Sequence, residues 1–210
     1  MAINMVAAIV SFLIGTGINF VLAPYLVKEL GSETYGFIGL ANNFVQYATI
    51  VTSALNSMSG RFISIEYSKG NIDKASRYFS SVLVADLIIA GVLLLVSSII
   101  TFNIEFILNV PENLVDSVKI LFALTFATFI ISVITAIFTT AAFVKNKLYI
   151  NSLRDIASNT LKLLLVVILF SFFPAKVYFL AMASLASGIF LLLTLSLIHI
   201  SEPTRLRRIS

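Results

Sequence analysis

The sequence predicts an all-α integral membrane protein, a bundle of six transmembrane helices, and three observations support this fold class. Of the 210 residues, 59% are hydrophobic. Only 11% are charged, well below the share of about 25% that is usual in a soluble domain. The hydrophobic residues come in blocks of about 20, the length that a helix needs to cross a hydrocarbon core of roughly 30 Å. A soluble protein of this composition would lack the polar residues to cover its surface.

Six apolar blocks divide the chain, and each is expected to form one transmembrane helix. They cover approximately residues 2–27, 35–58, 80–101, 118–143, 156–173 and 176–198. A helix is required because lipid offers no hydrogen-bond partner to unpaired backbone groups. Pro24 lies near the end of the first block and is expected to kink or end that helix. Pro174 predicts a tight turn between the fifth and sixth blocks.

The connecting segments alternate in charge, and this alternation predicts the orientation of the chain. Segments 59–79 and 144–155 are rich in Lys and Arg, whereas segment 102–117 has acidic residues and neither Lys nor Arg. Basic segments stay in the cytoplasm. We therefore expect a bacterial inner-membrane protein with its N-terminus and its even-numbered loops in the cytoplasm. Basic loops then explain the net charge of +4, and no nucleic-acid partner is expected.

The last residues, 199–210, form a short basic segment directly after an apolar helix. From residue 201 they spell SEPTRLRRIS, which resembles translated sequencing-adapter read-through, and we expect this tail to be artefactual. A short basic cytoplasmic tail would fit the same topology. We assign no function to its charged residues or to His199.

Three helices carry polar residues at helical spacing. These are Asn4, Ser11, Gly15 and Asn19 in the first block, Asn42, Gln46, Thr49, Ser53 and Asn56 in the second, and Thr125, Thr128, Ser132, Thr135 and Thr139 in the fourth. Such faces avoid lipid and point into a bundle. Ordinary helix packing explains any one of them, with hydroxyl groups bonded back to the preceding turn. Three such faces in one unit favour a hydrophilic cavity.

Ionisable residues within the apolar blocks are rarer and more informative. Asp86 and Lys162 both lie about two turns from the cytoplasmic start of their helices. We expect them to pair with each other or to line a substrate path. Lys162 has a simpler interpretation, because its long stem can carry the ammonium group to the lipid headgroups. For Arg61, at the cytoplasmic end of the second helix, the simpler interpretation is an interfacial anchor.

No sequence pattern of an enzyme active site is present. The chain has no HExxH motif, no phosphate-binding loop, no GxSxG motif and no cluster of carboxylates. It contains no Cys, which excludes disulfides and thiolate metal sites. We expect a protein that is not an enzyme and that uses no metal or cofactor.

Four stretches resemble bacterial polysaccharide flippases of the Wzx type. They are LAPYLVKELG at residues 22–31, ETYG at 33–36, LANNF at 40–44 and ALNSMSGRFI at 54–63. These flippases belong to the multidrug/oligosaccharidyl-lipid/polysaccharide exporter superfamily. The resemblance covers about residues 4–198 and is most specific in residues 1–80.

The resemblance implies one six-helix lobe of a MATE-like transporter, in which two lobes surround a central cavity. This chain would be the N-terminal lobe, and its partner would be the missing C-terminal lobe of the same protein. The implied activity is translocation of undecaprenyl-pyrophosphate-linked oligosaccharide across the inner membrane for surface polysaccharide biosynthesis. The candidate residues for the substrate path are Asn19, Asn42, Asn43, Gln46, Asn56, Arg61, Asp86, Thr128, Ser132, Thr135 and Lys162.

Three alternatives stay open at this point. A cation-coupled multidrug exporter of the same superfamily would share the fold, although the motifs around Pro24 and Arg61 favour the flippase. A membrane-embedded polysaccharide enzyme such as a polymerase would need a long periplasmic loop and clustered catalytic residues, and neither is found. The third alternative is a fragment that has no activity of its own, because one lobe cannot enclose a transport path.

Overall fold

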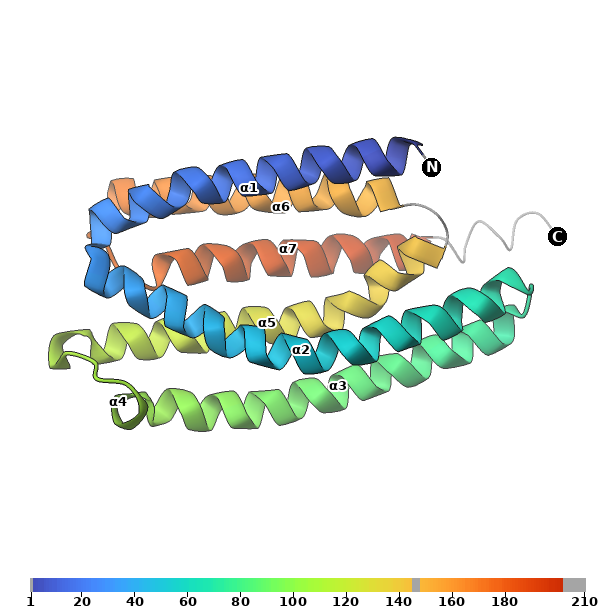
Figure 1. The fold of residues 1–210 in the computed structure, drawn as a ribbon, viewed down its shortest axis with the longest axis horizontal. Coiled ribbons are helices and arrows are strands. Elements are labelled where there is room, and N and C mark those ends of the chain that lie inside the picture. The colour runs from blue at the N-terminus through green and yellow to red at the C-terminus, as the bar shows by residue number, and fades with distance from the viewer. Residues whose placement is uncertain (1, 145–147, 202–210) are drawn as a thin grey trace.

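The computed structural model describes residues 2–144 and 148–201, and these residues form an all-α bundle (Figure 1). The long helices of the described part are α1 (Ala2–Leu30), α2 (Ser32–Ser68), α3 (Ile72–Phe102), α5 (Val115–Val144), α6 (Leu148–Phe172) and α7 (Phe179–Ser201). A short helix, α4 (Ile104–Ile107), and a 3-10 turn, η1 (Glu112–Leu114), connect α3 to α5. The predicted fold class, an all-α membrane protein, is confirmed.

Four segments of the described residues are long and apolar enough to cross a membrane. They are Ala2–Leu30, Ile72–Phe102, Glu112–Ala136 and Leu148–Phe172. A shorter apolar segment, Phe179–Thr194, lies in α7. Polar residues recur along α2, and it is not among the four. The number of six membrane crossings therefore stays a prediction.

The helices are longer than the apolar blocks, and the largest difference falls in segment 59–79, which was predicted to be a loop. There α2 continues to Ser68 and α3 begins at Ile72, so that residues 69–71 alone connect them. Hydropathy marks only the apolar part of a helix. The helix itself extends as far as its backbone hydrogen bonds continue. The 37 residues of α2 extend over about 55 Å, more than a hydrocarbon core of roughly 30 Å requires. The length of α2 is therefore sufficient for the tip of the α2–α3 hairpin to extend beyond a hydrocarbon core.

Backbone bonds around Gly70 close the turn of this hairpin. Gly70 has a φ of 79°, a conformation that favours glycine. Its N–H donates to the carbonyl of Tyr67, and the N–H of Asn71 donates to the carbonyl of Glu66, each at 3.0 Å. This pair of bonds is the Schellman arrangement that commonly ends a helix.

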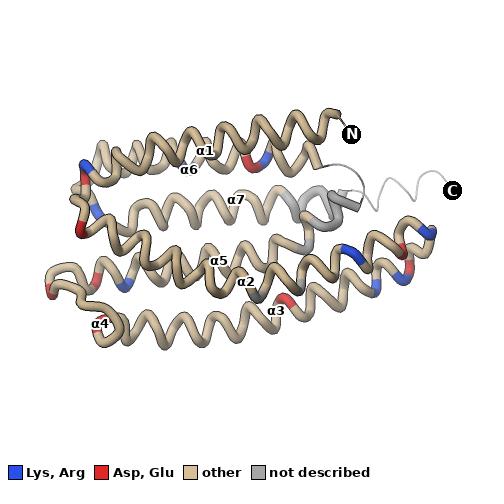
Figure 2. Tube along the Cα trace, in the orientation of Figure 1, with Lys and Arg blue, Asp and Glu red and all other residues tan. Residues whose placement is uncertain are grey.

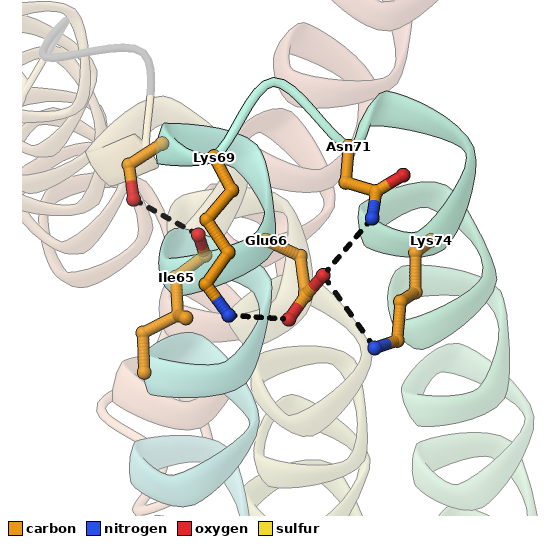
Figure 3. Close-up of polar contacts among 6 residues, drawn as sticks. Ile65, Glu66, Lys69, Asn71 and Lys74 are labelled. Carbon is orange, nitrogen blue, oxygen red and sulfur yellow. Dashed lines mark hydrogen bonds and ion pairs between the residues drawn. The ribbon is translucent and has the colours of Figure 1, made fainter.

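The carboxylate of Glu66 joins the two helices of the hairpin (Figure 3). It accepts hydrogen bonds from Lys69 Nζ at 3.2 Å and from Asn71 Nδ2 at 3.4 Å. Lys74 Nζ, on α3, lies 3.6 Å from the same carboxylate. The Glu66 side chain is 10% exposed, so this small cluster fixes the end of α2 against the start of α3.

Two helix ends differ from the sequence-based expectation. Of the two outcomes expected at Pro24, a kink or the end of the helix, the second is wrong, because Pro24 lies inside α1 and the helix continues to Leu30. Helices in membranes tolerate such prolines where neighbouring groups satisfy the freed carbonyl. The break between α1 and α2 occurs instead at Gly31, whose φ is 82°. The predicted tail 199–210 begins inside α7, which continues to Ser201, and its other residues lie outside the described part.

The bundle has a defined order of neighbours (Figure 1). α1 packs on α6, α6 on α7, and α7 on α5. α5 also contacts α2 and α3, which form the hairpin. α1 and α2 meet at their shared end and then diverge, so α1 and the hairpin flank the bundle on opposite sides (Figure 1).

Two clusters of buried apolar residues hold the helices together. The larger contains Phe37, Ile38 and Ala41 of α2, Ile104 of α4, Val118, Leu121, Phe122 and Phe126 of α5, and Val177 and Ala181 around the start of α7. The smaller contains Leu22 and Leu26 of α1, Val166 of α6 and Ala183 of α7. Both clusters lie in the half of the bundle that contains the α1–α2, α3–α5 and α6–α7 connections. Apolar packing is therefore concentrated at that end.

Large apolar side chains also cover the outside of the bundle. Phe12, Phe20 and Phe172 are 69%, 81% and 77% exposed, and many Leu, Ile and Val residues accompany them. An exposed apolar surface of this extent is typical of a protein that interacts with a membrane.

Charged residues gather near the two ends of the bundle (Figure 2). The end with the α1–α2, α3–α5 and α6–α7 connections, here called the acidic end, carries Glu29, Glu33, Glu105, Glu112 and Asp116 beside a smaller number of Lys residues. The end with the hairpin tip and the start of α6, here called the basic end, carries Arg61, Lys69, Lys74, Arg77 and Arg154 beside the smaller number of acidic residues Glu66, Asp73 and Asp155. The alternation of charge along the sequence thus becomes a separation of charge in space.

Candidate functional site

A cavity of about 580 Å³ lies between α1, α2, α5, α6 and α7, and we call it the central cavity. Polar residues from all five helices line it, namely Asn19, Asn42, Thr49, Thr125, Thr128, Ser132, Lys162 and Ser184. Apolar residues such as Leu22, Leu26 and Phe129 complete its wall. The volume falls within the range of about 300 to 1,000 Å³ that is usual for ligand pockets.

Lys162 is the one charged residue that the described structure places on the wall of this cavity. Its Nζ donates a hydrogen bond to Asn19 Oδ1 at 3.4 Å, which links α6 to α1. The sequence predicted both residues for the substrate path, and the structure brings them together. Because the partner of the ammonium group is a neutral amide, its charge is left to attract an anion.

The hydroxyl face of α5 contributes three residues to the central cavity. Thr125, Thr128 and Ser132 line it, while each hydroxyl donates to a carbonyl of the preceding turn at 2.7 to 2.8 Å. Thr135 makes the same kind of bond, to Ile131 at 2.7 Å, but is buried away from the cavity. The hydroxyl face of α5 therefore fits both ordinary helix packing and a hydrophilic cavity. A hydroxyl group that donates its hydrogen to the preceding turn can still accept a hydrogen bond from a ligand.

The polar face of α2 divides between two pockets. Asn42 and Thr49 line the central cavity, and Asn56 lines a second pocket nearer the basic end. Gln46 and Asn43 are exposed and line neither pocket.

The polar face of α1 serves mainly to pack this helix on α6. Asn4 Oδ1 accepts a hydrogen bond from the backbone N–H of Tyr149 at 3.1 Å. A Cβ atom at Gly15 would lie 3.4 Å from Asn159 Nδ2, so the glycine allows close approach. Ser11, Gly15 and Asn19 border a side pocket of about 360 Å³ with Asp155 and Asn159. Of the predicted stripe on α1, only Asn19 reaches the central cavity.

The second pocket, of about 790 Å³, is here called the basic-end pocket. It lies between α2, α5 and α6 and is lined by Asn56, Ser57, Gly60, Arg61, Ser64, Ile65, Thr139, Leu148 and Asn151. The predicted path residues Asn56 and Arg61 are therefore together, but in a pocket other than the one that contains Lys162.

Asp86 does not pair with Lys162, and the expected ion pair is wrong. α3 lies against α2, α4 and α5, whereas α6 lies against α1, α5 and α7. Asp86 is 2% exposed, and its Oδ2 has no hydrogen-bond partner among the described residues. Spacing along the sequence gives the depth of a residue in its helix, but not which helices are neighbours.

Sequence reasoning missed several polar residues that line the pockets, among them Ser184, Asn151, Ser57 and Ser64. Ser184 belongs to the central cavity and repeats with Ser187 and Thr194 on α7, a spacing that could have marked this helix as a fourth polar one. Asn151 belongs to the basic-end pocket, and its position in a segment predicted to be a loop concealed it. Within the described ranges, no group of three or more His, Cys, Asp or Glu residues could hold a metal ion.

Comparisons with known proteins identify the family. Residues 2–207 match the family model described as polysaccharide biosynthesis protein. The chain is 33% identical over 187 residues to EpsK of Bacillus subtilis (strain 168), described as an uncharacterized membrane protein. That alignment covers 89% of the chain and 37% of EpsK, so the chain spans little more than a third of this relative. No solved structure is significantly similar to the chain. The chain belongs to the polysaccharide biosynthesis protein family, in agreement with its resemblance to Wzx-type flippases.

Proposed function

We propose that this chain is one lobe of a transporter that moves undecaprenyl-pyrophosphate-linked oligosaccharide across the bacterial inner membrane. The supporting observation is the central cavity, where five helices present hydroxyl and amide groups around the ammonium group of Lys162. Within an apolar helix bundle, an ammonium group that has a neutral amide as its partner lies at considerable cost without an anionic ligand.

The chemistry of the wall matches that of the substrate. Sugar hydroxyl groups both donate and accept hydrogen bonds, as do the amides of Asn19 and Asn42 and the hydroxyl of Ser184. A pyrophosphate is an anion that a single Lys can hold as a point charge. The cavity would thus replace water around a sugar–pyrophosphate head while the polyprenyl chain stays in lipid. The activity requires no bond to be made or broken, and the protein acts as a transporter and not as an enzyme.

The orientation follows from the two charged ends. Basic segments are retained in the cytoplasm, so the basic end with Arg61, Lys69 and Lys74 faces inward and the N-terminus is cytoplasmic. Alternating access needs a second lobe that moves against the first. The partner of this chain is therefore a second helical lobe, which agrees with the greater length of EpsK.

Transport by proteoliposomes tests this function. The complete product of the gene that encodes this chain is reconstituted with a fluorescent undecaprenyl-pyrophosphate oligosaccharide, and a membrane-impermeant quencher reports its leaflet. Lys162→Gln should slow translocation at least about tenfold, because a charge-assisted hydrogen bond contributes about 1.5 to 3 kcal/mol.

Lys176→Gln is the matched control, because it removes the charge of an exposed Lys at the acidic end of the same bundle. Its rate should stay within about twofold of the unmodified protein, as expected for an exposed charge. Translocation no faster than in empty vesicles, or equal losses in the two variants, would contradict the proposal.

A further inference from the structure

The basic-end pocket is a second polar site, separate from the central cavity. The two pockets share no lining residue, although both are bounded by α2, α5 and α6. The two apolar clusters of the core lie toward the opposite end of the bundle, and neither includes a residue that lines this pocket. Its lining residues belong to the part of α2 that precedes the hairpin tip, to α5 and to the start of α6.

Arg61 gives this pocket a positive charge. Its guanidinium is exposed and has no ion pair or hydrogen bond with any described residue. No carboxylate lines the pocket within the described part of the chain. Glu66 follows on the same helix, but Lys69, Asn71 and Lys74 occupy its carboxylate. Arg61 therefore remains available to an anion, and its planar fork fits the oxygens of a phosphate.

Three buried polar atoms beside Arg61 also lack partners. Asn56 Oδ1, Ser64 Oγ and Asn151 Oδ1 are shielded from solvent, and none has a hydrogen-bond partner among the described residues. Each residue lines the basic-end pocket, and together they come from α2 and α6. A buried polar group without a partner costs about 1 to 3 kcal/mol, so three in one pocket indicate a ligand that supplies hydrogen-bond donors.

We infer that the basic-end pocket binds a phosphate-linked sugar and receives the head of the substrate before it reaches the central cavity. This inference rests on the proposed function. The phosphate meets Arg61, and the sugar hydroxyls donate to Asn56, Ser64 and Asn151. A phosphate alone would leave the amide oxygens of Asn56 and Asn151 unsatisfied, and an uncharged sugar would leave Arg61 without a counter-ion. The pocket volume of about 790 Å³ accommodates both parts.

Cysteine protection tests the inference, since the chain has no Cys of its own. Ser57 lines the pocket and is exposed, so a small polar thiol reagent should label Ser57→Cys in the complete gene product, with any other Cys replaced, held in nanodiscs of neutral lipid. Glucose 1-phosphate should slow labelling at lower concentration than inorganic phosphate or glucose does. Ser81→Cys, exposed on α3 and outside the pocket, should show no protection.

Arg61→Gln should raise the glucose 1-phosphate concentration needed for half protection about tenfold or more. Arg77→Gln is the matched control, since it removes an exposed Arg of the same end that does not line the pocket, and it should change the value less than about twofold. Asn151→Leu, which removes an acceptor and keeps all charges, should weaken protection by glucose 1-phosphate but not by inorganic phosphate. This second variant decides the matter if Arg61→Gln does not fold.

Equal protection by glucose 1-phosphate and inorganic phosphate would overturn the inference, as would equal effects of Arg61→Gln and Arg77→Gln. Protection by nanodiscs of anionic lipid without added sugar would instead assign the pocket to phospholipid headgroups and would also overturn it. The outcome of this protection experiment can be distinguished from the outcome of the transport experiment that tests the proposed function. If Lys162→Gln abolishes transport while glucose 1-phosphate never protects Ser57→Cys, the transporter stands and the second site does not.

Discussion

Asp86 and Lys162 are both ionisable and both lie within apolar helices, but their surroundings differ. Lys162 borders a polar cavity and has the amide of Asn19 as its partner. Asp86 is enclosed between α3 and its neighbours, with one carboxylate oxygen unpartnered. Lys162 is therefore placed to meet a ligand, whereas the ionised form of Asp86 destabilises the folded state.

Asp86→Asn is expected to stabilise the chain at neutral pH. The change removes a charge and keeps the shape of the side chain, so it should raise the free energy of unfolding by up to about 2.5 to 3.5 kcal/mol, the cost of a charge at a helix centre. Thermal unfolding in detergent, followed by circular dichroism, measures this effect. Glu112→Gln, an exposed change in η1, should alter stability by less than about 0.5 kcal/mol. A less stable Asp86→Asn variant would mean that the carboxylate has a partner.

At the scale of residues, helical spacing predicted single positions better than pairs. Of the eleven residues predicted for the substrate path, Asn19, Asn42, Thr128, Ser132 and Lys162 line the central cavity and Asn56 and Arg61 line the basic-end pocket, while Asn43, Gln46, Asp86 and Thr135 line neither. A helical period shows which residues share a face, so these positions could be found. The partner of Lys162 could not, because the order of neighbours in the bundle decides it, and that order brings α1 rather than α3 beside α6.

At the scale of elements, the α2–α3 hairpin is the part that the sequence described least well. Polar residues between 59 and 79 suggested a loop, and they form instead the ends of two helices that extend beyond the apolar blocks. The structure places the turn at Gly70 and Asn71, and the contacts of Glu66 with Lys69 and Lys74 explain why the two helices persist to it. Polar and charged residues occur both in loops and at the ends of helices, so a hydropathy pattern cannot distinguish the two.

The hairpin tip should loosen in acid. The hydrogen bond from Lys69 lowers the pKa of Glu66 below its ordinary value of 4.5; loss of solvent opposes this shift, and the charges of Lys69 and Lys74 add to it. Because the pKa is lower in the folded state, the stabilisation is present above pH 4.5 and is lost as the pH falls through the folded-state pKa. The protection of the Gly70 and Asn71 amides against hydrogen exchange, corrected for intrinsic rates, should therefore decrease over the same range of pH.

Glu66→Gln should remove this acid-dependent step and should lower the protection of the same amides at neutral pH. Glu33→Gln, an exposed change in the first turn of α2, is the control and should leave both unchanged. Protection that is identical in Glu66→Gln and in the unmodified chain would show that the backbone bonds around Gly70 hold the turn without the carboxylate.

At the scale of the whole molecule, the sequence predicted an all-α membrane bundle with charge alternating between its ends, and the structure has both features (Figure 2). Composition and block length are sufficient for the fold class because lipid permits few backbone arrangements. The positions of the two pockets were beyond the sequence. They depend on where α1 diverges from α2 and on where the apolar clusters stop, and both are properties of packing.

Protection of a single cysteine in the central cavity by the proposed substrate is the decisive measurement. Ser184→Cys lies on the cavity wall, whereas Met182→Cys lies on the same helix and is 41% exposed outside the cavity. In the complete gene product, a small polar thiol reagent should label Ser184→Cys, and undecaprenyl-pyrophosphate oligosaccharide should slow that labelling, while undecaprenol should not. Labelling of Ser184→Cys that the oligosaccharide leaves unchanged, or that undecaprenol slows equally, would contradict transport of the sugar–pyrophosphate head through this cavity.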